Sequence, residues 1–298
     1  MQRTKLAIVV LGLSLLGHGT AHAQSVSPEP RARALVSVDS PRLTVAAALC
    51  VGLGIALSLG APQPPPRWGG NPFDDAVRDG LRVRDTDARH AVGLASDFLV
   101  LGLVAYTALV DGLAMPLSQD GPDAAWRSTA AYALVIGVTL TLDELVKDAA
   151  ARSRPLEPGC DTSPLPAHCT ALTRGMSFYS GHAATSFASA GFSCAMHLGR
   201  SLYGDTATDG TACGASLLAA TAIGLFRVMA DQHYLTDVLV GAIVGFATGY
   251  LIPILLIPER RPLADRTSAA DPSVFVLPAA TLGSTGVDSI GLNALGAF

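Results

Sequence analysis

Charged side chains are scarce in this sequence of 298 residues. Asp, Glu, Lys and Arg together make up 15% of the chain, whereas a soluble domain usually carries about 25%. Aromatic residues make up only 6%, and hydrophobic residues make up 50%. The net charge of −4 offers no basic surface of the kind that binds nucleic acid. The shortage of charge therefore favours a protein that lies in a membrane.

Lysine is almost absent, because the chain contains only Lys5 and Lys147 and every other basic residue is arginine. Cysteine is also sparse, and none of the five cysteines has the C-x-x-C spacing of a zinc site. Cys160 and Cys169 lie in a polar, Pro-rich stretch. In an exported loop this spacing predicts a disulfide, and two unpaired thiols are the alternative.

Residues 1–23 have the features of an export signal. Two basic residues, Arg3 and Lys5, precede an apolar run from Leu6 to Leu16, and Ala21-His22-Ala23 has the small-x-small pattern of a cleavage site. We expect a signal peptide here, with an uncleaved anchor helix as the alternative. Residues 24–42 are polar and contain two prolines, so we expect a flexible segment.

Six apolar segments follow within residues 43–257, and each is close to the ~20 residues that cross a bilayer. They run from about 43 to 61, 92 to 115, 128 to 146, 181 to 198, 212 to 230 and 236 to 257. The fourth is rich in Ala, Ser and Gly, which suits packing between other helices better than contact with lipid. The sequence predicts an all-α, membrane-embedded six-helix bundle, with a soluble all-α domain as the alternative.

Two further stretches flank these segments. Residues 76–89 are highly charged and favour a helix on the membrane surface. Residues 258–298 are rich in Ala, Gly, Ser and Thr without a strong helical period, so we expect a loose tail with a little strand.

A first motif, Lys147-x6-Arg154-Pro155, follows the third apolar segment. Residues seven apart lie on one face of a helix, so the two basic side chains can converge on one anion. Pro155 would then end the helix. The basic flank of a membrane helix is the alternative for this pattern, and Asp143, four residues before Lys147, can pair with it.

A second motif, Tyr179-Ser180-Gly181-His182, leads into the fourth segment. Ser180 is a plausible helix N-cap, and the free N–H groups of a helix N-terminus suit a phosphate. Gly181 allows the backbone to approach a ligand closely. His182 would stand at the edge of such a site, where it can deliver a proton, although a single histidine in this setting is more often structural.

The third motif is Arg227-x5-His233-x3-Asp237, between the fifth and sixth segments. If His233 and Asp237 share a helix, they lie on one face. A carboxylate bonded to one ring nitrogen fixes the tautomer and leaves the other nitrogen free to attack. The alternative is a polar loop with ordinary charges.

Together the three motifs resemble the signatures of the type 2 phosphatidic acid phosphatase family, which also includes vanadium haloperoxidases and bacterial acid phosphatases. The resemblance covers roughly residues 140–250. Two positions depart from the family pattern: Tyr179 stands where the family usually has Pro, and Phe226 stands where it usually has Ser. Neither departure removes a titrating group, but the second removes a possible hydrogen bond to phosphate.

The resemblance implies a role for each motif residue. His233 attacks phosphorus and becomes a phosphohistidine, Asp237 orients it, and His182 protonates the leaving oxygen and then activates water. Further residues hold the phosphoryl oxygens through fixed positive charge and backbone N–H groups; they are Lys147, Arg154, Ser180, Gly181 and Arg227. The family needs no metal or other cofactor.

The implied substrate is a lipid-linked phosphate or diphosphate, such as phosphatidic acid, phosphatidylglycerol phosphate, an isoprenyl diphosphate or a lipid A phosphate. Transfer to an acceptor alcohol and a non-catalytic scaffold are the alternatives. Six spans place the loops that carry the motifs on one side of the membrane. A cleaved signal would put that side in the cytoplasm, whereas an oxidised Cys160–Cys169 pair and the family habit favour the periplasmic face of a bacterial inner membrane, which is our expectation.

Further titratable residues are present besides the motif positions. Asp97 and Asp111 lie near the ends of the second segment, where acids at membrane depth are functional candidates by default but can also reach water. Asp231 is expected to be a solvated loop acid. His197 has no partner that the sequence identifies.

Overall fold

The computed structural model describes residues 38–60, 65–155, 175–257, 274–283 and 286–296. The chain divides into two compact units, residues 1–259 and residues 260–298. The first unit contains the bundle and the second contains a hairpin.

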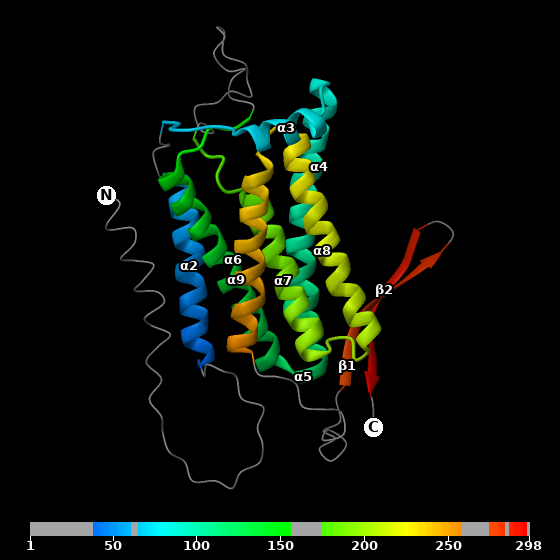
Figure 1. The fold of residues 1–298 in the computed structure, drawn as a ribbon. Helices are drawn as coiled ribbons and strands as arrows, with labels where there is room; N and C mark the ends of the chain where they lie inside the picture. The colour runs from blue at the N-terminus through cyan, green and yellow to red at the C-terminus, as the bar shows by residue number, and fades with distance from the viewer. Residues whose placement is uncertain (1–37, 61–64, 156–174, 258–273, 284–285, 297–298) are drawn as a thin grey trace. The chain divides into compact units, whose positions relative to one another are not determined.

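Six long helices make up the bundle in the described part of the first unit (Figure 1). They are α2 (Ser40–Gly60), α4 (Thr86–Tyr106), α6 (Pro122–Ala150), α7 (Gly181–Arg200), α8 (Thr206–Met229) and α9 (Leu235–Leu256). Shorter helices join them: α3 (Pro72–Leu81), the π-helix η1 (Thr107–Ala114) and α5 (Met115–Asp120). This architecture confirms the predicted six-helix fold.

Local capping explains why several helices begin earlier than the apolar segments do. Asp85 caps α4 by accepting from Ala88 N, and Asp205 caps α8 by accepting from Thr208 N at 2.8 Å. Pro122 is the first residue of α6, and Gly121 before it has a φ of 88°, which changes the direction of the chain. The polar first turns therefore belong to the helices, although segments bounded by hydropathy alone do not include them.

The predicted surface helix over residues 76–89 is wrong in its limits. The helix found there, α3, starts four residues earlier, at Pro72, because Asn71 accepts from the N–H groups of Phe73 and Asp74. It ends at Leu81, and the chain leaves the helical conformation before α4 begins.

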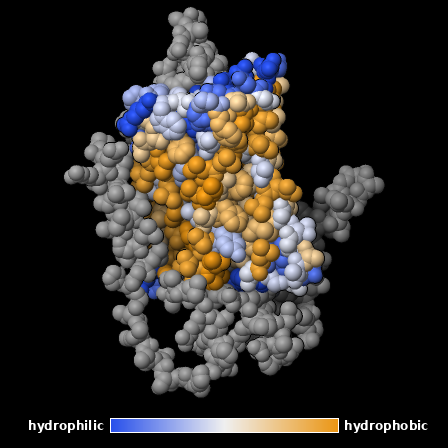
Figure 2. Space-filling view, in the orientation of Figure 1, coloured by the Kyte–Doolittle hydropathy of each residue, from blue (hydrophilic) through white to orange (hydrophobic). Residues whose placement is uncertain are grey.

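On the face that Figure 2 shows, the bundle is apolar across its middle and hydrophilic at its ends. Five helical segments among the described residues are long and apolar enough to cross a membrane. Helix α7 is not one of them, and most of its side chains are buried between its neighbours. The chain is thus of the multi-pass membrane type, and the small-residue helix packs inside it as the sequence predicts.

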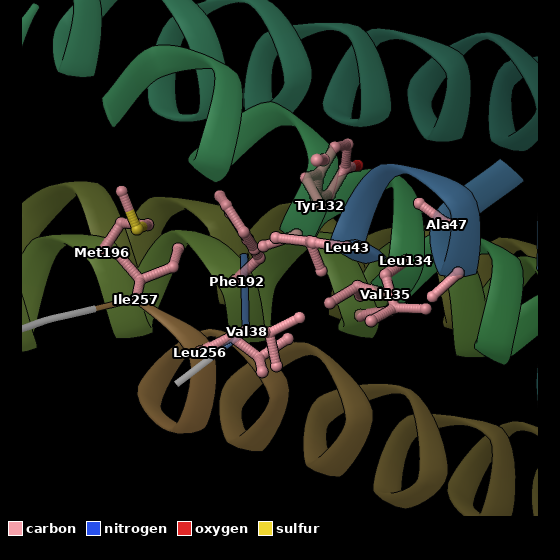
Figure 3. Close-up of a cluster of buried hydrophobic side chains, with 14 of the residues drawn as sticks. Val38, Leu43, Ala47, Tyr132, Leu134, Val135, Phe192, Met196, Leu256 and Ile257 are labelled. Carbon is pink, nitrogen blue, oxygen red and sulfur yellow. The ribbon is translucent and has the colours of Figure 1, made fainter. Parts of the chain in front are cut away.

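The main core fills the space between α2, α6, α7 and α9 (Figure 3). Leu43, Val135 and Phe192 are fully buried there, and the rings of Tyr132 and Phe192 meet edge to face with centroids 4.9 Å apart. This cluster ties the first apolar helix to the three helices that carry Lys147, His182 and Asp237.

Helices α7 and α9 approach each other through glycines at positions 241, 245 and 249. A Cβ atom added at Gly245 would collide with the carbonyl oxygen of Ala184, and one at Gly249 with that of Ala188. A Cβ at Gly241 would lie 2.6 Å from Ser180 O. Small residues at a four-residue spacing allow this backbone contact, which holds the start of α7 against the start of α9.

A disulfide joins α7 to α8 through Cys194 and Cys213. The sequence analysis did not anticipate this pair, and the predicted pair Cys160–Cys169 lies outside the described residues. Cys50 is a free, half-buried thiol.

A buried polar cluster lies around His197, near the end of α7. Its Nδ1 is 2.7 Å from Asp209 Oδ1 on α8, and its Nε2 is 3.3 Å from Asp111 Oδ1 on η1. His197 therefore has partners on two neighbouring elements, and Asp111 belongs to this cluster rather than to solvent.

The second unit forms an antiparallel hairpin of β1 (Val274–Gly283) and β2 (Gly286–Gly296). The register pairs Val274 with Gly296 and Gly283 with Gly286, with an irregularity after Thr281. Residues 258–298 thus contain more strand than expected. Two valines and a phenylalanine begin β1, and these residue types suit a strand.

We predict that Gly245→Ala destabilises the bundle by about 1–3 kcal/mol, because the new methyl group forces α7 and α9 apart. Gly102→Ala on α4 is the matched control, since an added Cβ there meets nothing within 4 Å. Thermal unfolding in detergent measures both. Equal melting temperatures for the two variants would contradict the proposed close contact.

Candidate active site

The three motifs meet at one end of the bundle, the end that carries α3 in Figure 1. Lys147 lies on the last turn of α6, Ser180 caps α7, and Arg227 lies on the last turn of α8. His233 lies in the short loop before α9, and Asp237 lies in the first turn of α9.

Direct contacts join the motifs to one another. A Cβ atom at Gly181 would lie 2.5 Å from Asp143 Oδ2 and 3.2 Å from Lys147 Nζ, so the second motif touches the first. Ser180 N donates to Asp237 O at 3.1 Å, so the second motif also touches the third. The structure therefore gathers residues separated by up to ninety positions into one site.

Arg154 reaches this site from irregular backbone. The expectation that Pro155 ends the helix is wrong, because α6 ends at Ala150 and Ala151 adopts the left-handed conformation with φ 48°. The next residue, Arg152, forms isolated β-bridges with Trp68 and Met176. The first motif thus combines a helical lysine with an arginine from an extended segment.

His233 is 2% exposed, and its Nδ1 lies 2.9 Å from the carbonyl oxygen of Ser177. A carbonyl oxygen can only accept, so Nδ1 carries the proton and donates it. The neutral ring then has its lone pair on Nε2, which is the nitrogen free to attack.

The expected hydrogen bond between Asp237 and His233 is not made. Asp237 Oδ2 lies 3.7 Å from His233 Nδ1, beyond hydrogen-bond distance. The two residues do not share a helix, since α9 begins at Leu235. Asp237 instead accepts from Ser177 Oγ at 2.6 Å and from Tyr234 N at 3.0 Å. Ser177 therefore lies between the two residues, because its Oγ donates to Asp237 and its carbonyl oxygen accepts from His233.

Burial lowers the pKa of His233 well below its ordinary value, and the nearby positive charges of Arg154, Arg227 and Lys147 lower the pKa further. The imidazole is consequently neutral at physiological pH, with Nε2 unprotonated. A neutral imidazole surrounded by cations is suited to attack an anionic phosphate, because the cations attract the substrate and leave the nitrogen lone pair available.

His182 contacts a residue that the sequence analysis left undecided. Its Nε2 lies 2.8 Å from Asp97 Oδ1 on α4, and the same oxygen accepts from Arg227 Nη1 at 2.8 Å. The His182 side chain is 32% exposed, so a substrate can reach it. Asp97 is thus part of the site. The sequence indicated it in one way only, as an acidic residue within an apolar segment.

Carboxylates partly balance the cations of the site. Lys147 Nζ lies 2.5 Å from Asp143 Oδ2, the pair that the spacing predicted. The Nε atoms of Arg154 and Arg227 are buried without a hydrogen-bond partner. Unsatisfied buried donors cost free energy, and an anion such as phosphate would satisfy them.

The expectation for Asp231 is wrong. Its side chain is 1% exposed and forms a bidentate pair with Arg78, with N–O distances of 2.5 and 2.8 Å. Arg82 and Arg89 lie within 3.8 Å of it. This acid ties the loop before His233 to α3 and α4 rather than facing solvent.

Within the described parts of the chain, no group of three or more His, Cys, Asp or Glu side chains has the geometry to hold a metal ion. The contacts of His182, His233 and the surrounding cations suit proton transfer, nucleophilic attack by His233 and electrostatic stabilisation of an anion.

Comparison with known proteins bears on this arrangement. Residues 128–260 match the family model described as the PAP2 superfamily, and this range contains all of the motif residues. No curated protein sequence matches the chain significantly. A solved structure, the first transmembrane PAP2 type phosphatidylglycerolphosphate phosphatase from Bacillus subtilis, has 20% sequence identity and a TM-score of 0.38, covering 83% of this chain and 93% of that chain.

Residues 128–260, which contain His182, His233 and the three cations around His233, thus match the PAP2 superfamily model, and they lie within a helical membrane protein.

Proposed function

We propose that the protein is a metal-independent phosphatase that hydrolyses a lipid-linked phosphate monoester or diphosphate through a phosphohistidine on His233. The observation that carries this proposal is the environment of His233. A buried imidazole has its Nε2 lone pair free, and three cations from the first and third motifs surround it. Phosphoryl transfer depends on this kind of fixed positive charge around the transferred group.

In the first step Nε2 of His233 attacks phosphorus, and the bond from phosphorus to the leaving oxygen breaks. The leaving oxygen takes a proton from His182, whose charged form is favoured by Asp97 and by the negative phosphate bound beside it. Lys147, Arg154 and Arg227 stabilise the charge on the equatorial oxygens. The Ser177 carbonyl stabilises the positive charge that the His233 ring acquires, because Nδ1 donates to it throughout.

In the second step water attacks the phosphohistidine. His182, now neutral, accepts a proton from that water, as microscopic reversibility requires. The phosphorus–nitrogen bond breaks, inorganic phosphate leaves, and the electron pair returns to Nε2. Asp97 holds the His182 ring through both steps because it contacts Nε2 at 2.8 Å.

A lipid substrate is supported by the position of the site, at the end of the apolar band of the bundle (Figure 2). Three apolar side chains near the site end are exposed: Trp68, Phe73 and Leu81. A phosphate at membrane headgroup level would lie beside the motif residues while its acyl or isoprenyl chains remain in the bilayer.

Phosphate release from lipid phosphates by the detergent-purified protein tests the proposal. We predict release that resists a chelator and is inhibited by vanadate. His233→Ala should lower kcat/KM by at least about 10³-fold, because it removes the nucleophile. Added alcohol acceptors distinguish hydrolysis from transfer, since a phosphorylated alcohol forms only in transfer.

His90→Ala is the matched control, because His90 is exposed on the first turn of α4 and is expected to leave the activity unchanged. A chain with no activity toward lipid or soluble phosphate esters would be a scaffold, and full activity in His233→Ala would exclude the phosphohistidine.

The lowered pKa of His233 predicts an unusual pH profile. The nucleophile is active when deprotonated, so the acid limb of kcat/KM should lie below the ordinary histidine value of 6.5. Arg154→Ala removes a cation that lowers this pKa, so the limb should move to higher pH in the variant. The shift between the two proteins is the measurement, because ionisation of the substrate affects both equally. An unchanged limb would contradict the proposed environment.

The proposal further places the site on the periplasmic face of a bacterial inner membrane. In a cysteine-free background, Pro66→Cys puts a thiol at the site end, and Thr206→Cys puts one at the other end of the bundle, where α8 begins. Both positions are exposed. An impermeant thiol reagent applied to intact cells should label the first variant alone. Labelling of the second alone would place the site in the cytoplasm.

A further inference from the structure

Arg152 is a buried cation that the motifs do not contain. It lies two residues before Arg154, and its side chain is 1% exposed. The guanidinium carbon lies 4.5 Å from the centroid of the Trp68 ring and 4.2 Å from that of Tyr234. A guanidinium that stacks on two aromatic rings is held in one plane, so its donors have fixed directions.

These donors connect three separate elements. Nε donates to Gly69 O at 3.0 Å, Nη2 donates to Asp74 Oδ2 at 2.6 Å on α3, and Nη1 donates to Asp237 Oδ1 at 2.5 Å on α9. Nη1 also donates to Thr236 Oγ1 at 2.8 Å. Arg152 therefore binds a carboxylate on each side, and both carboxylates are fully buried.

A continuous chain of hydrogen bonds leads from Arg152 to His233. Asp237 receives Nη1 of Arg152 on one oxygen and Ser177 Oγ on the other. The backbone of Ser177 is fixed as well, because its N–H donates to Arg152 O at 3.0 Å. The carbonyl of Ser177 then accepts the Nδ1 proton of His233. Arg152 thus holds, through two routes, the group that sets the His233 tautomer.

Asp74 supports Arg152 from the other side. Its second oxygen accepts from the N–H of Thr236, in the first turn of α9, at 3.0 Å. Removing its charge would leave Arg152 balanced by Asp237 alone and would weaken the attachment of α3 to α9. Asp74 lies outside residues 128–260, the range that matches the family model, so this contact comes from a part of the chain that the family pattern does not describe.

We propose that Arg152 and Asp74 are positioning residues, which keep the proton of His233 on Nδ1 and its Nε2 directed at the phosphate. This proposal rests on the proposed phosphatase function. Neither residue belongs to the set that holds the phosphoryl oxygens. Both act by fixing Asp237 and Ser177, so they affect the rate of attack rather than the binding of the anion.

Arg152→Lys and Asp74→Asn test the proposal, since each keeps the approximate size of the side chain. Lysine retains the charge but not the forked geometry, and small displacements near a nucleophile can cost about 10²-fold in rate. We expect kcat to fall by about 10–100-fold in Arg152→Lys and less in Asp74→Asn. We expect KM and inhibition by inorganic phosphate to change by less than about threefold, since binding contacts remain.

Arg127→Lys is the matched control. Arg127 is half-buried near the start of α6, at the opposite end of that helix from Lys147, and it donates to Val38 O at 3.0 Å. The kcat of the Arg127→Lys variant should therefore equal that of the unmodified protein. An unchanged kcat in both Arg152→Lys and Asp74→Asn would overturn the proposal. The proposal would also be overturned if the affinity for inorganic phosphate fell by the same factor as kcat. Equal losses would indicate general disruption of the site. If Arg152→Lys does not fold, Asp74→Asn decides alone.

A second readout does not depend on activity. Nitrogen chemical shifts of ¹⁵N-histidine-labelled protein in detergent report the tautomer of each imidazole, and His233→Gln assigns the signal. We expect His233 as the Nδ1–H tautomer in the unmodified protein and a mixture in Arg152→Lys. If the unmodified protein has no phosphatase activity but shows this change, the proposed function fails and the positioning role stands. An identical tautomer in both proteins would contradict the positioning role.

Discussion

The structure depends on one electrostatic constraint, which is that several cations are buried around a single neutral imidazole. Lys147 and Arg154 come from the first motif and Arg227 from the third, and all three lower the pKa of His233. Their mutual repulsion has to be balanced, since uncompensated buried charge is strongly destabilising. Asp143 balances Lys147 and Asp97 balances Arg227. The remaining buried donors on the two arginines have no partner among the described residues, and a phosphate would complete the set.

The bundle meets this constraint by bringing helix ends together. Helix α7 has too few large apolar side chains to face lipid, and its small residues let α9 pack directly on its backbone. Ser180, at the start of α7, is consequently in contact with Asp237. The ends of α6 and α8 reach the same level because both run toward this end of the molecule (Figure 1). The packing that makes α7 a poor membrane-facing helix is thus what assembles the site.

Much of the fold follows from the sequence, because spans of about twenty apolar residues and their number fix which loops share a side. The convergence of Lys147, Ser180 and His233 follows from the same reasoning. The partner of the His233 ring did not follow, since it is the Ser177 carbonyl and a backbone acceptor has no residue-type signature. Arg152 was not distinguished from Arg154, because its partners Asp74 and Asp237 lie on α3 and α9 and are brought to it only by the fold. The Cys194–Cys213 pair requires knowledge of how α7 and α8 pack, which spacing alone does not provide.

The central claim is that His233 carries the phosphoryl group during turnover. Its most direct measurement is a single-turnover reaction of stoichiometric enzyme with a phosphorus-labelled lipid phosphate, quenched in alkali and mapped by peptide mass spectrometry. The account predicts an alkali-stable, acid-labile phosphoryl group on the peptide that contains His233, formed and lost at rates that match phosphate release. A phosphoryl group on another residue, or phosphate release with no covalent intermediate in a single turnover, would contradict it.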